Sequence, residues 1–393
     1  MSLSNNKKIP YGRQDINQED IDKVVEILRS DFLTQGPAVP AFESAVAKYC
    51  DAKHAVAVNS ATSALHIACL AIGVGPGDLV WTSPITFVAS SNCALYCGAS
   101  VDFVDIDPRT YNMSIEALAE KLYEAKKTDT LPKVVIPVHM SGQSCDMASI
   151  HELSQQYGFD IIEDASHALG GRYKNKPIGN GCYSAMSVFS FHPVKMITSG
   201  EGGMVVTNDS KLLKNLRLLR SHGITSNSED MHSRAPEQIW NYQQIGLGFN
   251  YRMTDIQAAL GLSQLKRLDE FVTKRQNIAK RYDQLLMDLP VITPWQHKDS
   301  YSSYHLYLIQ LEFKDKNAQH RVFDALRKDG VLVNLHYIPV YLQPYYEQLG
   351  FKEGHCPEAE KYYKCVITIP IYPRLLGEEQ DQVVESIKKV LNS

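Results

Sequence analysis

Short apolar runs alternate with amphipathic stretches from about residue 54 to residue 210, and this alternation limits the chain to few folds. The β-branched or apolar runs include HAVAV, LVWTSP, VDFVDID, VVIPVH and FDIIEDA, and helical stretches such as SATSALHIACLAIGV and IEALAEKLYEA separate them. Strands that take turns with helices form βαβ units, which build a mainly parallel sheet covered by helices on both faces. We therefore predict a mainly parallel, three-layer α/β/α domain.

The pattern changes after Asn250. A long helical pattern, DIQAALGLSQLKRLDEFVTKRQNIAKRYDQLL, is followed by YHLYLIQLEF, the helix-like HRVFDALRKDG, VLVNLHYIP and a terminal helix from Glu378. This order is typical of a smaller α+β domain that a long helix joins to the first domain. We place the large domain, with an N-terminal arm, at residues 1–250 and the small C-terminal domain at residues 251–393.

Charge and cysteine usage exclude several function classes. The chain has 40 basic and 44 acidic residues, a formal charge of -4 and no basic block, so we expect neither nucleic acid nor an anionic membrane as a partner. No segment approaches the ~20 apolar residues that a bilayer span needs, and we expect a cytoplasmic enzyme. The eight cysteines show no C-x-x-C pair or zinc-ligand spacing, which predicts reduced thiols and no metal site.

The first motif that can carry chemistry is NSATSAL, where the strand HAVAV runs into a helix. A helix N-terminus with small hydroxyl residues offers free N–H groups and the positive end of a dipole, which suits a phosphate. A plain N-cap by Ser or Thr explains the same residues.

The second motif is DIIEDASHAL, in which an apolar strand ends on Glu163 and Asp164 and is followed by Ser166 and His167. Ligands bind at the carboxyl ends of parallel strands, and an aspartate there can hold a protonated ring nitrogen by a charge-assisted hydrogen bond. Magnesium ligation or helix capping are equally ordinary uses of an acidic strand end.

The third motif is SVFSFHPVKMITSGEGGMVVTN, which places Ser190, His192 and Lys195 between a strand and a glycine-rich turn. A lysine in a loop is usually solvated, but this stretch carries little other charge. A partly desolvated amine with a lowered pKa can form a Schiff base. The G-x-G-G run opens a strand rather than a helix, so it is not a dinucleotide fingerprint.

These motifs occur together in one recognisable order. NSATSAL, EDASHALGG, FSFHPVK with SGEGGMVVTN, RSHGI and GFNYRMTDIQAALGLSQL resemble the DegT/StrS family of pyridoxal-phosphate (PLP) sugar aminotransferases over nearly the whole chain. The resemblance implies a fold-type I PLP-dependent transferase that uses pyridoxal 5'-phosphate as cofactor and passes through pyridoxamine 5'-phosphate.

The resemblance also implies roles for individual residues. Lys195 and Asp164 would be catalytic, with Lys195 carrying the cofactor and moving protons and Asp164 pairing with the pyridine nitrogen. Asn250 would reach the phosphate of the neighbouring subunit, which implies a homodimer with shared active sites. The implied cofactor-binding residues are Ala61, Thr62, Phe87, Asp164, His167, Ser190, Lys195 and Asn250.

Two of these positions depart from the common family pattern, since Gly is usual at Ala61 and Gln is frequent at His167. A backbone N–H survives the first change, and a ring nitrogen can replace the amide in the second. For Phe87, which would stack on the cofactor ring, a position in the hydrophobic core is the alternative.

For the sugar nucleotide, the family analogy points to Tyr11, Asp31, Phe32, Leu33, Thr34, His336 and Tyr337. Tyr11 as a surface aromatic and HYIP as a strand end closed by Pro339 are the ordinary alternatives. Arg220, in LRSHGI, would hold a diphosphate or a donor carboxylate, or would form a structural salt bridge.

The segments SDFLTQGP, EDASHA and HYIPVY are most similar to the branch of the family that acts in pseudaminic-acid biosynthesis. That branch implies transfer from L-glutamate to C4 of UDP-2-acetamido-2,6-dideoxy-β-L-arabino-hexos-4-ulose, with ping-pong kinetics. The alternatives are amination of another 3- or 4-keto-6-deoxy nucleotide sugar and a sugar dehydratase, in which His replaces the lysine. A PLP-binding regulator and a nicotinamide-dependent enzyme are less well supported, because the chain has no spare DNA-binding module and no glycine fingerprint near its first strand.

Overall fold

The computed structural model describes residues 8–232, 238, 240–312 and 318–391, and its centre is a seven-stranded sheet in the order β2-β10-β9-β6-β5-β3-β4. β10 is antiparallel to both neighbours, and the other adjacent pairs are parallel. The mainly parallel sheet predicted from the strand and helix alternation is therefore confirmed. The strands are β2 (His54–Val58), β3 (Leu79–Thr82), β4 (Ser100–Phe103), β5 (Val134–Ile136), β6 (Asp160–Asp164), β9 (Met186–Ser190) and β10 (Gly203–Thr207).

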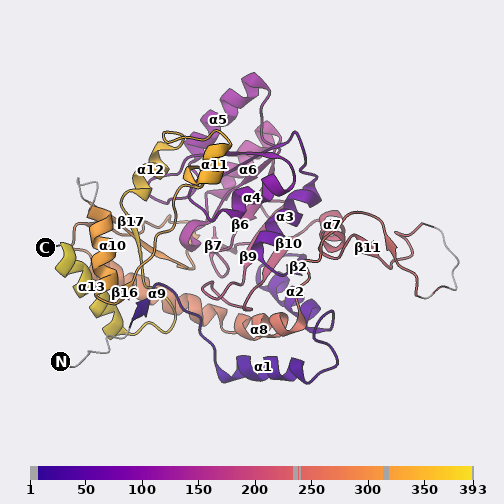
Figure 1. The fold of residues 1–393 in the computed structure, drawn as a ribbon, viewed down its shortest axis with the longest axis horizontal. Coiled ribbons are helices and arrows are strands. Elements are labelled where there is room, and N and C mark those ends of the chain that lie inside the picture. Colours follow the sequence, from indigo (N-terminus) through magenta and orange to yellow (C-terminus); the bar gives the residue numbers. More distant parts are fainter. Residues whose placement is uncertain (1–7, 233–237, 239, 313–317, 392–393) are drawn as a thin grey trace.

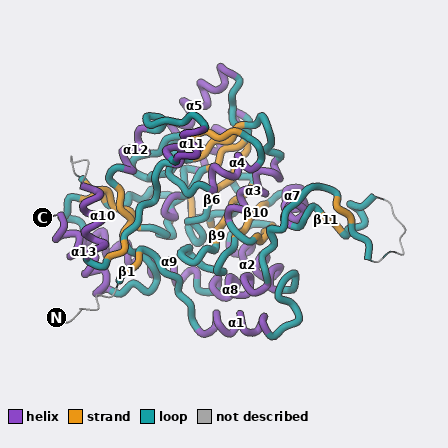
Figure 2. The backbone as a smooth tube through the Cα atoms, viewed as in Figure 1, coloured by secondary structure: helices purple, strands orange, loops and turns teal. Residues whose placement is uncertain are grey.

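Helices cover both faces of this sheet, and Figure 2 shows its strands in the interior of the molecule. Side chains alternate between the faces with a period of two residues. In β2, Val56 and Val58 join the core under one set of helices, whereas Ala55 and Ala57 join the core on the other face. The first set is α3 (Ala61–Ile72), α4 (Ala89–Tyr96) and α7 (Ser210–Arg220), and the second is α2 (Ala38–Tyr49), α5 (Ile115–Thr128), α6 (Met147–Tyr157) and α8 (Asp255–Leu265).

The C-terminal part has its own hydrophobic core, which includes Tyr282, Tyr307 and Ile387. Its sheet consists of β13 (Val291–Ile292), β15 (Tyr307–Leu311) and β17 (Val366–Ile369), and its main helices are α9 (Leu268–Leu285), α10 (Ala318–Lys328) and α13 (Gly377–Leu391). The N-terminal arm pairs here as well, because β1 (Ile9–Pro10) lies parallel to β16 (Val331–Leu332), near α10 and α13 in Figure 1. The domain boundary at residue 250 stays a prediction.

The remaining elements are short or lie at the edges of the molecule. They are α1 (Gln18–Leu28), β7 (Arg172–Tyr173), β8 (Lys176–Pro177), β11 (Ile224–Thr225), β12 (Gln243–Gln244), β14 (Ser300–Tyr301), α11 (Pro344–Gln348), α12 (Pro357–Tyr363) and the 3-10 turns Met140–Gly142 and Val340–Leu342.

The eight cysteines are free, and six of them are buried. Within the described ranges, every helix is too short or too polar to cross a membrane.

The long helix predicted after Asn250 is in fact two helices, α8 and α9, that meet at Lys266 and Arg267. Arg267 leaves the helical conformation, with φ -104° and ψ 5°. Its guanidinium donates to the carboxylates of Asp15 at 3.1 Å and Asp20 at 2.6 Å, which anchors the N-terminal segment. The helical periodicity of the sequence continues through Lys266 and Arg267, so it does not predict this break. The break coincides with the contacts of Arg267 to Asp15 and Asp20, which are distant in the sequence.

An arm that contains β11 and β12 projects from the body of the molecule (Figure 1). The arm carries large apolar side chains in solvent, with Trp240 74%, Tyr242 62% and Leu247 82% exposed. Exposed aromatic and aliphatic side chains gathered on one projection are typical of a protein interface.

Candidate active site

A cavity of about 880 Å³ lies at the carboxyl ends of the strands of the large sheet. The last residues of β6 and β9, Asp164 and Ser190, line it, as does Asn59 directly after β2. This edge of a parallel sheet is where ligands bind, because loops and helix N-termini converge there. The predicted site residues that line the cavity are Tyr11, Ala61, Thr62, Phe87, Asp164, His167, Ser190, Lys195, His336 and Tyr337.

The start of α3 presents backbone N–H groups to the cavity. Ser60 caps the helix, and its side chain accepts a hydrogen bond from the amide of Ser63. Among the described residues, the amides of Ala61 and Thr62 have no acceptor, and both residues line the cavity. Two free amides at the positive end of a helix dipole suit a phosphate, so the capping and phosphate interpretations of NSATSAL are compatible.

Gly203 allows β10 to lie directly against this helix start. It pairs with Val58 on one side and Ser190 on the other. A Cβ atom at this position would lie 2.4 Å from the carbonyl oxygen of Ser60, which is shorter than any tolerated contact. The last glycine of the SGEGG turn is therefore required by a close backbone approach beside the amides of α3.

Asp164 holds a buried carboxylate, 5% exposed, at the end of β6. Its backbone is fixed on the β5 side, because its amide donates to Pro137 and its carbonyl accepts from His139. Its Oδ1 accepts from the amide of Ser166 at 3.1 Å, and its Oδ2 accepts from the hydroxyl of Ser90 at 2.6 Å. The side chain is thus held in one orientation at the wall of the cavity.

Lys195 lies half-buried in the loop between β9 and β10, where its amide donates to the carbonyl of His192 at 2.9 Å. Burial lowers the pKa of its amine to about 8, although the nearby charge of Asp164 acts in the opposite direction. With this pKa, roughly a tenth of the amine is neutral at pH 7, far more than for a free lysine, and only the neutral form is a nucleophile.

Phe87 lies on the cavity wall and is 59% exposed. The alternative that Phe87 belongs to the hydrophobic core is therefore wrong. A large exposed aromatic ring beside a buried carboxylate and an amine with a lowered pKa provides a face on which a planar ring can stack.

Neutral imidazole and phenol groups form another wall of the cavity. Nε2 of His167 lies 3.3 Å from the Tyr337 hydroxyl, and the two rings are stacked at 22°. Burial keeps the pKa of His167 well below its ordinary value and lowers that of His336 to about 3. Tyr11 packs on His336 with ring centroids 5.1 Å apart. This wall can donate and accept hydrogen bonds without adding charge.

Two groups of predicted residues lie away from this cavity. Asp31, Phe32, Leu33 and Thr34 are exposed, and Thr34 bridges to Thr254 next to α8. Asn250 is exposed at the base of the projecting arm, where it pairs with Ser221. The chain by itself does not bring either group to the cavity. Arg220 forms the structural salt bridge that the sequence left open, with its guanidinium 2.5 Å from Glu43.

Sequence reasoning missed four further residues near the reacting groups. His305 and Asn334 line the cavity, and the ring centroid of His305 lies 4.5 Å from that of His167. Both flank short strands of the C-terminal part, a position that carries no chemical signal in the sequence. Thr86 and Ser90 lie in the SPITFVAS segment, in which Phe87 alone stood out.

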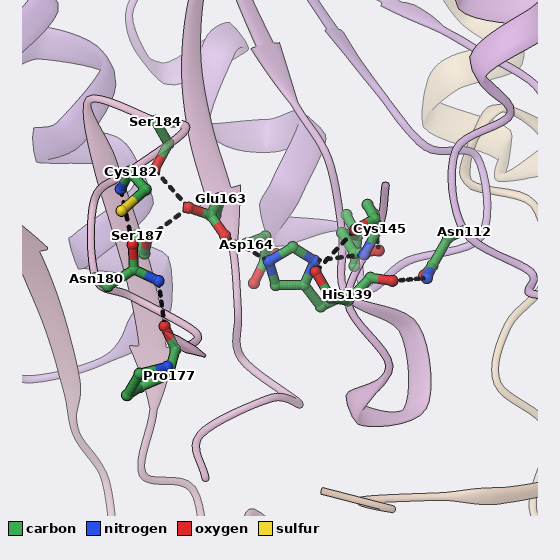
Figure 3. Close-up of polar contacts among 12 residues, drawn as sticks. Asn112, His139, Cys145, Glu163, Asp164, Pro177, Asn180, Cys182, Ser184 and Ser187 are labelled. Carbon is green, nitrogen blue, oxygen red and sulfur yellow. Dashed lines mark hydrogen bonds and ion pairs between the residues drawn. The ribbon is translucent and has the colours of Figure 1, made fainter. Parts of the chain in front are cut away.

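Glu163 points to the opposite face of β6 from Asp164 and forms the centre of a buried hydrogen-bond network (Figure 3). Its carboxylate accepts from His139 Nε2 at 2.7 Å, from Ser184 at 2.5 Å and from Ser187 at 3.0 Å. The amide of Cys145 donates to His139 Nδ1, which places the ring proton on Nε2. Burial would raise the pKa of Glu163, but these donors outweigh it and hold the pKa below its usual value.

Replacing Glu163 with leucine should lower the free energy of unfolding by about 3 kcal/mol, because the partners of the buried carboxylate lose their acceptor. Glu163→Gln keeps one acceptor oxygen and should cost less. Urea unfolding followed by circular dichroism measures both. Glu152→Gln, at an exposed position of α6, is the control and should change stability by less than about 0.5 kcal/mol. Equal stability of the leucine variant and wild type would contradict the role of this network.

The cavity fits PLP in each of its chemical parts. Free amides at α3 and the Ser190 hydroxyl suit a phosphate, and Phe87 offers a stacking face. Asp164 suits a protonated ring nitrogen, and the amine of Lys195 suits an aldehyde. A bound PLP would supply an electron sink for the substrate carbon.

A family model described as the DegT/DnrJ/EryC1/StrS aminotransferase family matches residues 14–388. The chain belongs to this family. Among its relatives, the spore coat polysaccharide biosynthesis protein SpsC of Bacillus subtilis is 39% identical, with 100% of this chain and 99% of SpsC aligned. A UDP-4-amino-4,6-dideoxy-N-acetyl-beta-L-altrosamine transaminase of Campylobacter jejuni is 37% identical, over 98% of this chain and 97% of the transaminase.

Solved aminotransferase structures share the fold over nearly the whole chain. Helicobacter pylori PseC, an aminotransferase of pseudaminic-acid biosynthesis, superposes with a TM-score of 0.90 at 33% identity, covering 98% of this chain and 100% of PseC. The sugar aminotransferase Spr1654 of Streptococcus pneumoniae, solved in a PMP form, superposes with a TM-score of 0.89 at 29% identity, covering 98% and 99%; it is also known in a PLP form. The protein is thus a PLP-dependent sugar aminotransferase with the fold-type I architecture expected from the sequence.

Proposed function

We propose that the enzyme transfers the amino group of L-glutamate to C4 of UDP-2-acetamido-2,6-dideoxy-β-L-arabino-hexos-4-ulose. The main support for amino transfer is that Lys195, whose amine has a pKa of about 8, lies at the wall of the cavity that Asp164 also lines. The dehydratase alternative has histidine in place of this lysine. Support for the particular sugar comes from the Campylobacter jejuni transaminase and from PseC.

In this proposal Lys195 and Asp164 are the catalytic residues. The Lys195 amine holds the cofactor and moves protons to and from the reacting carbon, while Asp164 keeps the ring nitrogen protonated. Ala61, Thr62 and Ser190 hold the phosphate, Phe87 stacks on the ring, and His167 approaches the ring edge. Tyr11, His336, Tyr337 and the segment 31–34 are proposed to contact the sugar nucleotide.

The test uses glutamate labelled with heavy nitrogen. Enzyme loaded with PLP and treated with labelled glutamate should release 2-oxoglutarate, and after removal of the amino acid it should transfer the label to the UDP-linked 4-keto sugar. Mass spectrometry of the product measures the transfer, and NMR locates the new amine. A product aminated at C3, or a product that has lost water without gaining nitrogen, would refute the proposal.

A second candidate is amination of another 3- or 4-keto-6-deoxy nucleotide sugar. SpsC favours it, because a protein named for spore coat polysaccharide biosynthesis is 39% identical to this chain. Offering the loaded enzyme UDP-linked and dTDP-linked keto sugars side by side separates the candidates by kcat/KM. A preference for a dTDP sugar of at least tenfold would favour the second.

The rate at which the apoprotein takes up PLP should rise with pH, with a midpoint near the Lys195 pKa of about 8. The reason is that only the neutral amine reacts with the aldehyde, and its fraction grows as pH passes through its pKa. Because the charge of Asp164 raises this pKa, Asp164→Asn should move the midpoint to lower pH. Stopped-flow absorbance measures the rates, and a midpoint near that of free lysine would contradict the assignment.

We also propose a homodimer in which Asn250 of one subunit contacts the phosphate in the site of the other. The exposed Trp240 and Leu247 on the projecting arm support a contact that buries this arm against a second copy. Lys195→Ala and Asn250→Ala should each be inactive alone. After the two variants are unfolded and refolded together, about a quarter of wild-type activity should return, because each hybrid dimer would have one intact site. No recovery, despite hybrid formation detected with affinity tags, would contradict a shared site.

A further inference from the structure

A short run of hydroxyl groups extends from the cavity wall to Asp164. Ser90, on the first turn of α4, is 0% exposed, and its Oγ lies 2.6 Å from Asp164 Oδ2. Thr86, which lines the cavity and is 3% exposed, places its Oγ1 2.6 Å from Ser90 Oγ. Ser90 thus holds Asp164 from behind the cavity wall, and Thr86 in turn contacts Ser90.

The direction of these hydrogen bonds follows from the number of protons. An ionised carboxylate only accepts, so Ser90 uses its one proton toward Asp164. Thr86 must then be the donor to Ser90. The other acceptor near the Ser90 hydroxyl, the Phe87 carbonyl, is farther away, at 3.3 Å. The order Thr86 to Ser90 to Asp164 is therefore fixed, and donors in series strengthen one another.

The hydroxyl of Ser90 and the amide of Ser166 hold the two oxygens of Asp164 separately. Two donors on different oxygens fix the plane of the carboxylate and stabilise its negative charge. The same segment supplies Phe87, so residues 86–90 position both the stacking face and the carboxylate.

We propose that Ser90, with Thr86 behind it, is a positioning residue that keeps the Asp164 carboxylate charged and aimed at the ring nitrogen of PLP. This inference rests on the proposed role of Asp164. It predicts that Ser90 matters for a ligand that has the ring nitrogen and is unimportant for one that lacks it.

The experiment compares the dissociation constants of PLP and of an analogue in which C–H replaces the ring nitrogen. Ser90→Ala should weaken PLP binding about tenfold, the effect of losing one hydrogen bond to a charged group, and should change binding of the analogue by less than about twofold. Ser90→Thr keeps the hydroxyl and should retain the preference for PLP. The matched control is Ser91→Ala, since Ser91 is equally buried on the same turn but its hydroxyl contacts Tyr346; it should leave the preference unchanged.

The outcomes separate the positioning role of Ser90 from the proposed role of Asp164. If Ser90→Ala weakens PLP and the analogue equally, or neither, its role is structural and the inference is wrong. Asp164→Asn tests the premise separately: if it leaves the preference for PLP intact, the proposed role of Asp164 itself fails. Should Ser90→Ala not fold, Thr86→Val removes the donor behind Ser90 and should weaken PLP selectively, by about threefold; an equal effect on both ligands would overturn the inference.

Discussion

Replacing Lys195 with alanine should reduce amino transfer from glutamate by at least about 10³-fold, because one side chain both binds the cofactor covalently and moves the protons. The visible band of the cofactor should also differ from that of wild type, since PLP no longer has an amine to react with. Absorbance spectra before and after glutamate, together with 2-oxoglutarate release, measure both effects.

The stability of the Lys195→Ala variant should not fall. A partly buried amine whose pKa is lowered to about 8 opposes folding at pH 7, because folding then disfavours its charged form. Lys211→Ala, at an exposed position on α7, is the matched control and should keep full activity. Wild-type turnover in Lys195→Ala would remove the basis for assigning amino transfer to this residue.

Replacing Asp164 with asparagine should lower kcat for amino transfer by at least about 10²-fold while the protein stays folded. The amide has nearly the same shape and can still accept the hydrogen bond from the Ser166 amide. It carries no charge to keep the ring nitrogen protonated, so the cofactor becomes a weaker electron sink. Steady-state kinetics measures the loss of kcat, and thermal unfolding of the loaded enzyme shows whether the protein stays folded.

Asp160→Asn is the matched control for Asp164, because Asp160 lies on the same strand but at its exposed opposite end. This variant should keep wild-type kcat. If Asp164→Asn retained at least half of the wild-type kcat, the pairing of Asp164 with the ring nitrogen would be refuted.

The central sheet could be predicted because its signal is local. A strand buried on both faces reads as an apolar run, as HAVAV does, which becomes β2; in DIIED, which becomes β6, the apolar centre carries the same signal. The α8–α9 region shows the limit of local signals. Helical periodicity runs through Lys266 and Arg267, whereas the break coincides with contacts from Arg267 to Asp15 and Asp20 about 250 residues away.

The site was predictable where its residues follow strand ends. Asp164 and Ser190 end β6 and β9, and parallel strands bring their carboxyl ends to one edge. Ser90 and His305 were missed because each acts on a residue from a different element, and nothing in SPITFVAS or YHLY indicates that neighbour. For the segment 31–34 the sequence motif predicted a contact with the sugar nucleotide, but in the single chain these residues are exposed and lie away from the cavity.

The sequence by itself determined the order of strands and helices, the family motifs and the identity of the reactive groups, because periodicity and short motifs are local properties of the chain. Only the tertiary structure decided how those groups behave. The lowered pKa of Lys195 comes from burial, and the orientation of Asp164, at the end of a strand, comes from a serine on helix α4. Desolvation and hydrogen bonds between distant segments exist only after the chain has packed.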